Sequence, residues 1–259
     1  MITAGQNTKF GIEIKYLSEV INIVEEYNLK LIGINQHIGS LLMDGEAYVK
    51  STDVILSVAR QFDDLEFIDL GGGFGIPYQK QADHARLNLE DLGRKLSDTI
   101  HKWSHEYGKD IEFKIEPGRY IVAECSILLG KVNSLKMNYD LKYIGTDLGF
   151  NVLIRPAMYN AHHNIEIYPK DQVPSQKEEI IRIVGNICET GDIIAKDRKL
   201  PEIFEKDIIG VLDSGAYGFS MSSNYNKRLR PAEVLIQSDG APRLIRRRDT
   251  LEDLIRNFV

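Results

Sequence analysis

Apolar positions in the first 120 residues follow two alternating patterns. In three segments they recur every three or four residues, the spacing of one face of an α-helix; these segments are residues 18–27, 46–62 and 89–103. Short apolar runs, typical of strands, lie at residues 29–34, 67–70 and 111–115. Ser18 is expected to cap the first helix. Strands that alternate with helices predict parallel βα units.

Each of these predicted strands ends at a polar or glycine-rich loop. In a parallel βα barrel, the loops at the carboxyl ends of the strands form the active site. A closed barrel has about eight strands, and only three or four can be recognised here. A half-barrel would expose unpaired strand edges. We therefore expect that the upstream half is missing from this chain or that another chain supplies it.

The second half has no long helical pattern. Short β-rich runs follow one another at residues 126–133, 142–146, 165–167, 179–184, 208–212 and 232–236. Such a succession predicts an antiparallel sheet. A terminal helix is expected after Thr250, because Asp253 completes a capping pattern. The predicted fold class is α/β plus β, with half a barrel in residues 1–120 and a β domain in residues 121–259.

Composition narrows the function. The sequence is 43% hydrophobic and 27% charged, with a net charge of −6, which is typical of a globular protein and argues against a nucleic-acid partner. Acidic residues follow the basic run at 246–248, so we expect an ion-paired edge there. Two cysteines give neither a disulfide framework nor a metal cluster. With no signal-like start and no long apolar run, we expect a cytoplasmic protein without a membrane partner.

The sequence His-Ile-Gly-Ser follows the first predicted strand at residues 37–40. The imidazole of His37 can lie flat on an aromatic cofactor, and the hydroxyl of Ser40 can bind a phosphate. A single histidine at a strand end is more often a hydrogen-bonded structural residue. This motif alone is therefore weak evidence for a cofactor.

Four glycines lie within residues 71–75, after the second predicted strand. Their backbone amides, at Gly72 and Gly73 above all, can surround an anion. The alternative is a tight turn that requires positive φ. The pattern is not the dinucleotide-binding fingerprint, and four glycines after a buried strand favour phosphate binding.

The third predicted strand ends in Glu-Pro-Gly-Arg at residues 116–119. The carboxylate of Glu116 can keep a pyridinium nitrogen protonated, and Arg119 can bind a carboxylate or a phosphate with its planar guanidinium. A strand-ending turn with a local ion pair explains the four residues equally well.

Two motifs in the second half suit an amino-acid substrate. Arg155 and Tyr159 are suited to a carboxylate. The neighbouring His162 and His163 lack a suitably spaced third metal ligand, so we interpret them as part of a surface loop and expect no metal.

A third motif in this half, residues 188–192, reads Cys-Glu-Thr-Gly-Asp. The thiol of Cys188 can deliver a proton, although most free cysteines are small buried hydrophobes. Glu189 can bind an ammonium. Further on, Tyr217 lies in Asp-Ser-Gly-Ala-Tyr-Gly and either reaches a phosphate or packs at a bend.

Taken in order, these motifs resemble the diaminopimelate decarboxylases, a family of fold type III (alanine-racemase-like) pyridoxal phosphate enzymes. The succession is His-Ile-Gly-Ser, Gly-Gly-Gly-Phe-Gly, Glu-Pro-Gly-Arg, Arg-Pro-Ala-x-Tyr, Cys-Glu-x-Gly-Asp and Gly-Ala-Tyr-Gly. The resemblance runs from about residue 3 to the end and includes residues 219–226 and 230–234. Thr190 stands where the family usually has serine.

The resemblance implies a homodimer in which a βα barrel is joined to a β domain, and which converts meso-diaminopimelate to lysine and carbon dioxide with pyridoxal 5′-phosphate. It implies that His37 stacks on the cofactor and that Glu116 holds its ring nitrogen. The other implied cofactor ligands are Ser40, Gly72, Gly73, Gly118, Arg119 and Tyr217. Implied substrate ligands are Arg119, Arg155, Tyr159, Glu189 and Tyr217, with Cys188 as the proton donor; Cys188 and Glu189 reach in from the partner subunit.

One departure from the family is large. In the family, a lysine in a Tyr-Ala-x-Lys-Ala-Asn-like context is attached covalently to the cofactor, and no lysine here has that context. We therefore expect that the chain lacks this segment and is inactive alone. Two alternatives stay open: a relative of the ornithine and arginine decarboxylases, which Arg155, Tyr159 and Glu189 disfavour, and a non-catalytic subunit that docks on a full-length decarboxylase.

Overall fold

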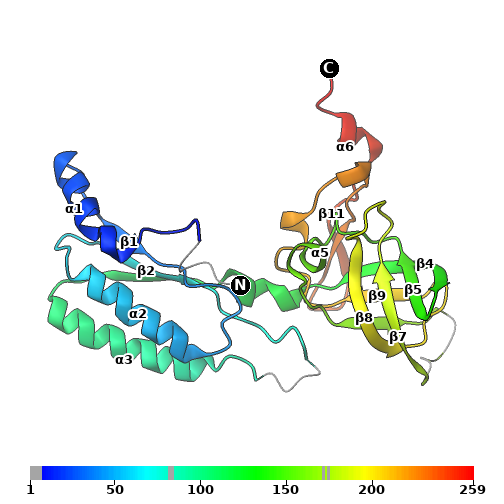
Figure 1. Cartoon of the computed structure of the whole chain (residues 1–259), viewed down its shortest axis with the longest axis horizontal. Helices are drawn as coiled ribbons and strands as arrows, with labels where there is room; N and C mark the ends of the chain where they lie inside the picture. Colours follow the sequence, from blue (N-terminus) through cyan, green and yellow to red (C-terminus); the bar gives the residue numbers. More distant parts are fainter. Residues whose placement is uncertain (1–7, 81–84, 171–172, 174–175) are drawn as a thin grey trace. The chain divides into compact units, whose positions relative to one another are not determined.

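The computed structural model describes residues 8–80, 85–170, 173 and 176–259. The chain divides into two compact units, one up to Ile121 and the other from Val122 onward (Figure 1). Each unit has a hydrophobic core of its own. In the described part of the chain, no helix has both the length and the apolar character needed to cross a membrane.

The first unit is built from βα repeats. Its elements are η1 (Ile14–Tyr16), α1 (Leu17–Glu26), β1 (Gly33–Asn35), α2 (Gly45–Ala59), β2 (Phe67–Gly72), α3 (Leu89–Tyr107) and β3 (Glu112–Glu116). The three strands form a parallel sheet in the order β1-β2-β3. Two short helices, α4 (Gly118–Val122) and η2 (Ala123–Cys125), follow β3. The prediction of parallel βα units is confirmed.

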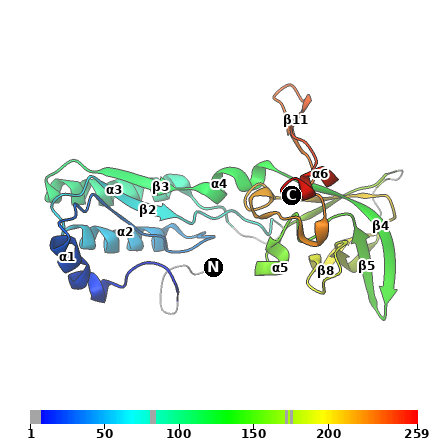
Figure 2. The same ribbon diagram turned by 90° about the horizontal axis from the view of Figure 1, so that it is seen from above.

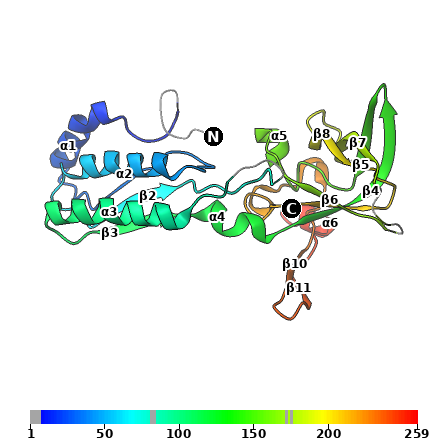
Figure 3. The same ribbon diagram turned by 90° about the horizontal axis from the view of Figure 1, so that it is seen from below.

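The core of this unit lies between the sheet and the two long helices, which run side by side (Figures 1 and 3). Tyr48 and Ile55 of α2, Leu92 and Trp103 of α3, and Ile68 of β2 are buried there. The Trp103 indole N–H donates to the carbonyl of Leu56 at 2.8 Å, so this large ring is buried without an unsatisfied donor.

Local signals explain where the long helices begin and end. The side chain of Asp44 caps α2 by accepting from the amide of Glu46, and Asn88 caps α3 by accepting from Asp91. Gly108 ends α3 in the left-handed conformation, at φ 74°.

Two expectations about the first residues need correction. Helix α1 begins at Leu17, so Ser18 lies inside it, and its N-cap Tyr16 makes no side-chain cap. The strand predicted at 29–34 is present, but it is shorter and begins later: β1 is Gly33–Asn35. Leu31 and Ile34 pack against the core, whereas Leu29 and Ile32 are exposed.

The second unit is a β domain. A six-stranded sheet has the order β6-β9-β4-β5-β7-β8. In chain order its strands are β4 (Leu128–Asn138), β5 (Leu141–Thr146), β6 (Ile165–Tyr168), β7 (Glu178–Val184), β8 (Ile193–Pro201) and β9 (Ile208–Val211). The other elements are α5 (Arg155–Tyr159), η3 (Phe219–Met221), η4 (Tyr225–Lys227), β10 (Glu233–Ile236), β11 (Pro242–Arg246) and α6 (Leu251–Ile255).

The sheet pairs are antiparallel except β5 with β7, which is parallel. The predicted antiparallel domain is thus confirmed with one parallel pair added. Strands β10 and β11 form a separate hairpin that stands away from the six-stranded sheet (Figures 2 and 3). The terminal helix α6 starts at the predicted capping box of Thr250 and Asp253.

The basic run at 246–248 forms an ion-paired edge, as expected. Arg246 pairs with Glu233 at 3.0 Å, and Arg247 donates two hydrogen bonds to the carboxylate of Asp253. Arg248 is exposed.

Strand β7 allows a matched test of this core. Ile183 is fully buried, whereas Ile180 on the same strand is 64% exposed. We predict that Ile183→Ala lowers the free energy of unfolding by about 2–5 kcal/mol, because it leaves a cavity. Ile180→Ala should change it by less than about 0.5 kcal/mol. Denaturant unfolding followed by circular dichroism measures both, and equal effects would contradict this burial pattern.

Candidate cofactor and substrate site

The predicted site residues of the first unit lie where its three parallel strands end. His37 and Ser40 follow β1, Gly72 is the last residue of β2, Glu116 is the last residue of β3, and Arg119 lies in α4. Because the strands are parallel and adjacent, their carboxyl ends meet at one edge of the sheet. This is the edge at which α/β folds bind ligands.

Arg119 joins two hydroxyl groups at this edge. Its Nη1 donates to the hydroxyl of Tyr78 at 2.9 Å, and its Nη2 donates to Ser40 Oγ at 3.0 Å. The guanidinium also lies 5.7 Å from the centre of the Tyr78 ring. Arg119 is thereby brought into one polar cluster with Tyr78, 41 positions earlier in the sequence, and with Ser40, 79 positions earlier.

Tyr78 was not predicted from the sequence. It lies three residues beyond the glycine loop in an Ile-Pro-Tyr sequence, and its ring is buried. A single tyrosine in such a loop gives no sequence signal of its own. Only the fold brings its hydroxyl to Arg119.

The glycine loop permits the three strand ends to touch through their backbones. A Cβ on Gly72 would lie 2.1 Å from the carbonyl oxygen of Glu116, and one on Gly73, whose φ is 100°, would lie 2.4 Å from the carbonyl oxygen of Gly39. Neither position accepts a side chain. The sequence suggested either phosphate binding or a tight turn with positive φ for this loop. The geometry requires glycine at both positions, because the backbones approach closely and Gly73 has a positive φ.

The amides of this loop also have protein partners. The Gly71 N–H donates to Asp69 Oδ1 at 2.8 Å, and the Gly72 N–H donates to His37 Nδ1 at 3.4 Å. The second bond places the His37 imidazole over the loop. The ring is nevertheless exposed, and Glu116 at the end of β3 is exposed as well.

Tyr48 supports the loop from within the core. This residue of α2 is 1% exposed, and its hydroxyl lies 3.0 Å from the carbonyl oxygen of Leu70 and 2.8 Å from that of Gly71. Burial raises the pKa of the Tyr48 hydroxyl, and the carboxylates of Asp69 and Glu116 raise it further. The phenol therefore stays protonated and acts as a donor. From the sequence, Tyr48 was predicted only to lie in the helix at residues 46–62.

The residues at this edge fit a phosphorylated aromatic cofactor. A guanidinium and two hydroxyls within hydrogen-bond distance of one another are donors of the kind that a phosphate requires. His37 offers an exposed aromatic ring, and Glu116 offers an exposed carboxylate.

In the second unit, Arg155 and Tyr159 lie on the short helix α5, one turn apart. Arg155 is 3% exposed, and its Nη1 lies 2.7 Å from Nε2 of His163. Tyr159 is 44% exposed. Among the described residues, no group of three potential ligands could hold a metal ion.

The expectation that both histidines lie in a surface loop is wrong for His163, which is fully buried. The segment between α5 and β6 is a loop, but it turns His163 inward. The ring Nδ1 lies 2.8 Å from the carbonyl oxygen of Leu212. A buried imidazole is stable only with its polar atoms paired, and Arg155 and Leu212 provide that pairing.

Cys188 and Glu189 lie on the loop between β7 and β8, and both are exposed. The alternative that Cys188 is a small buried hydrophobe is therefore wrong. The loop is held by the buried Asp192, whose carboxylate accepts from the amides of Phe150 at 2.7 Å and Ile187 at 2.8 Å. Burial raises the pKa of this carboxyl, although the two amides favour its ionised form.

Tyr217 lies 43% exposed on the loop after β9, in the left-handed conformation at φ 59°. The start of this loop is fixed by backbone bonds, from Ser214 N to Ser126 O and from Gly215 N to Ala123 O, both 3.0 Å long. A non-glycine residue at positive φ is uncommon and is often associated with a functional position.

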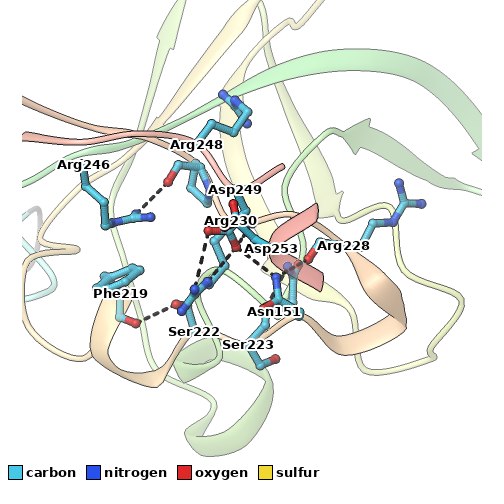
Figure 4. A network of polar contacts seen from close by, with 12 residues as sticks. Asn151, Phe219, Ser222, Ser223, Arg228, Arg230, Arg246, Arg248, Asp249 and Asp253 are labelled. Atoms are coloured by element: carbon cyan, nitrogen blue, oxygen red, sulfur yellow. Dashed lines mark hydrogen bonds and ion pairs between the residues drawn. The ribbon is translucent and has the colours of Figure 1, made fainter. Parts of the chain in front are cut away.

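A polar network joins the segment after Tyr217 to the C-terminal residues (Figure 4). Arg230 and Asp249 point toward one another and pair at 2.8 Å. The same carboxylate accepts from the backbone amide of Arg230 at 3.1 Å and from the side-chain amide of Asn224 at 3.0 Å. These hydrogen bonds lower the pKa of the Asp249 carboxyl to about 2, and the one from the Arg230 side chain has the largest effect.

Comparison with known proteins agrees with this geometry. Residues 1–123 match the pyridoxal-binding domain of pyridoxal-dependent decarboxylases, so pyridoxal phosphate is the cofactor that the match implies. Over 98% of its length, the chain is 40% identical to the diaminopimelate decarboxylase of Methanothermobacter thermautotrophicus. It covers only 60% of that relative.

Solved structures of diaminopimelate decarboxylases are also similar to this chain. A crystal structure of diaminopimelate decarboxylase superposes with a TM-score of 0.88 at 33% identity, over 98% of this chain and 62% of that one. The Helicobacter pylori diaminopimelate decarboxylase complexed with L-lysine gives 0.83 at 31% identity, over 98% and 62%. The chain thus spans about 60% of the length of the curated relatives it matches.

Asp249 makes stability depend on pH in acid. Its pKa is about 2 in the folded protein against an ordinary value of 3.8. A carboxyl with a lowered pKa stabilises the fold when ionised, so this stabilisation is complete above about pH 4 and is lost as pH falls toward 2. We predict that Asp249→Asn lowers the free energy of unfolding at pH 7 by about 1–2 kcal/mol, and that the difference from the wild type shrinks by pH 3.

The matched control is Asp140→Asn, the same chemical change at an exposed position. It should alter the free energy of unfolding by less than about 0.5 kcal/mol at any pH. Denaturant unfolding of the three proteins between pH 3 and 7 measures the effect. A constant gap between wild type and Asp249→Asn across that range would refute the ion pair as its source.

Proposed function

We propose that this chain, a relative of the diaminopimelate decarboxylases along 98% of its length, forms part of a pyridoxal phosphate-dependent decarboxylase that converts meso-diaminopimelate to L-lysine and carbon dioxide. The observation that carries the proposal is the cluster at the strand ends, where Ser40, Tyr78 and Arg119 meet beside the exposed His37 and Glu116. The chain spans about 60% of such relatives, and the proposed activity is that of the whole decarboxylase.

The first unit holds the cofactor in this proposal. Ser40, Tyr78 and Arg119 bind its phosphate, together with the backbone at Gly72 and Gly73 of the glycine loop and at Gly118 of α4. The imidazole of His37 would lie against the ring, and the carboxylate of Glu116 would keep the ring nitrogen protonated. When bound, the cofactor accepts the electron pair that remains when carbon dioxide leaves.

The second unit recognises the far end of the substrate. Meso-diaminopimelate carries a carboxylate and an ammonium there, and burying either charge without a partner costs several kcal/mol. Arg155 and Tyr159 bind the distal carboxylate, and Glu189 binds the ammonium. Tyr217 contacts both cofactor and substrate.

Cys188 delivers a proton to the carbon that has lost carbon dioxide. Its exposed position on the β7–β8 loop, beside Glu189, supports a role outside its own subunit. We infer that both residues reach the active site of a second copy in a cytoplasmic homodimer.

Ornithine and arginine decarboxylation is the weaker alternative. Neither substrate has a distal carboxylate, and Arg155 and Tyr159 would have no such group to bind. A docking subunit without catalysis would have no use for the cluster at Ser40, Tyr78 and Arg119.

Substrate preference tests the proposal. We would join the chain to the part of the Methanothermobacter relative that it does not match, and measure kcat/KM for meso-diaminopimelate, lysine and ornithine. We predict a preference for diaminopimelate of roughly 10⁴-fold, because the other two lack a charge for which the site is built. Arg155→Ala should erode the preference by weakening the diaminopimelate reaction. Cys188→Ala should lower turnover and leave the preference intact, and a preference unchanged in Arg155→Ala would contradict the assignment.

Cofactor binding is tested separately with pyridoxamine 5′-phosphate, which needs no covalent lysine. We predict that Ser40→Ala weakens its binding about tenfold in calorimetry, the loss of one hydrogen bond to a charged group. Ser57→Ala is the control, since Ser57 is on α2 and donates only to Val54 O at 2.7 Å. Pyridoxamine without phosphate should not distinguish Ser40→Ala from wild type. If it does, Ser40 does not act on the phosphate.

A further inference from the structure

The hydroxyl of Tyr48 reaches from α2 to two carbonyl groups at the start of the glycine loop. It lies 3.0 Å from the carbonyl oxygen of Leu70 and 2.8 Å from that of Gly71. Tyr48 is 1% exposed, and Leu70 and Gly71 are buried as well. A buried carbonyl that lacks a donor costs free energy, so this end of β2 requires the phenol.

The bond to Gly71 also sets the direction of the next amide. In a trans peptide the C=O and N–H groups point in opposite directions. Because the carbonyl of Gly71 points toward Tyr48, the N–H of Gly72 points away from it, and this N–H donates to Nδ1 of His37 at 3.4 Å. Tyr48 and His37 thus bond to opposite sides of one peptide group.

The backbone that leads into His37 is held by the same two elements. The Gln36 N–H donates to the carbonyl oxygen of Asp69 in β2 at 3.0 Å, and the Gln36 side-chain amide donates to Ser51 Oγ at 3.2 Å. Ser51 lies on α2, three residues after Tyr48, and its hydroxyl donates to the Tyr48 carbonyl at 2.8 Å. With the backbone placed in this way, the bond from Gly72 limits rotation of the His37 ring.

We infer that Tyr48 is a positioning residue for the cofactor: through the peptide group between Gly71 and Gly72, it holds the imidazole of His37 in the orientation that receives the ring of pyridoxal phosphate. This rests on the proposed function, in which His37 lies against that ring. An amide N–H only donates, so Nδ1 of His37 accepts, and the neutral imidazole carries its hydrogen on Nε2. A ring that is already oriented loses less freedom when the cofactor binds.

Tyr48→Phe tests the inference, because it removes the hydroxyl and keeps the ring in the core. The matched control is Tyr107→Phe at the end of α3, where the hydroxyl donates to the carbonyl oxygen of Phe62. Phe62 lies between α2 and β2, at the end of β2 that is opposite to the glycine loop. The control therefore measures what the first unit loses when a bond from a phenol to the backbone is removed away from the site.

Binding of pyridoxamine 5′-phosphate to the chain, measured by calorimetry, gives the first readout. Tyr48→Phe should weaken binding about fivefold, the effect of one neutral hydrogen bond, and Tyr107→Phe should leave it unchanged. In the His37→Ala variant, adding Tyr48→Phe should have no further effect, because the ring that Tyr48 positions is gone. A purely structural role predicts that the two effects multiply. That result, or wild-type binding by Tyr48→Phe, overturns the inference.

A second readout needs no ligand and uses the chain labelled with ¹⁵N. We expect the Gly72 amide hydrogen to exchange with solvent about tenfold faster in Tyr48→Phe than in wild type, and the His37 ring to become more mobile. Tyr107→Phe should match wild type at both residues. An unchanged Gly72 amide and His37 ring in Tyr48→Phe overturn the inference. Should none of the proteins bind pyridoxamine 5′-phosphate while these spectra are as expected, the proposed function fails and the positioning of His37 by Tyr48 stands.

Discussion

The loops after β1, β2 and β3 touch one another through backbone atoms, and this contact holds the predicted cofactor residues together. Carbonyl oxygens of Gly39 and Glu116 occupy the space in which side chains at Gly73 and Gly72 would lie. Backbone bonds reinforce the contact, since Leu42 N donates to Gly73 O at 2.9 Å and Gly75 N to Leu42 O at 2.9 Å. A side chain at either glycine would separate the loops and move His37, Ser40 and Arg119 apart.

The second unit fixes its exposed residues by another means, with buried polar groups whose bonds are satisfied. Asp192 holds the loop that carries Cys188 and Glu189, and Asp249 holds the segment beyond Tyr217 to the C-terminal residues. Removing one partner of such a group leaves the other buried and unpaired, which costs more than the bond itself contributes. The loops that carry Cys188, Glu189 and Tyr217 are thus exposed at their tips and hydrogen-bonded at their bases.

The sequence predicts those parts of the fold that depend on local pattern. The helices at 46–62 and 89–103 are recognisable because their apolar faces are continuous, and the strand-end motifs because glycine and proline interrupt apolar runs. Strand β8 was missed because charged residues fill its exposed face, so its apolar positions do not alternate cleanly. The contacts of Tyr78, Tyr48 and His163 were missed, since each is made with a partner more than 20 positions away, apart from the His163–Arg155 contact.

His163 shows why this last class escapes sequence reasoning. Its neighbours in sequence are polar or small, which is typical of a surface loop, and only the carbonyl of Leu212, 49 positions on, makes its burial stable. Burial removes the ring from solvent, the carbonyl of Leu212 places the hydrogen on Nδ1, and this tautomer makes Nε2 an acceptor for Arg155. Each step follows from the preceding one through an atom that can only donate or only accept.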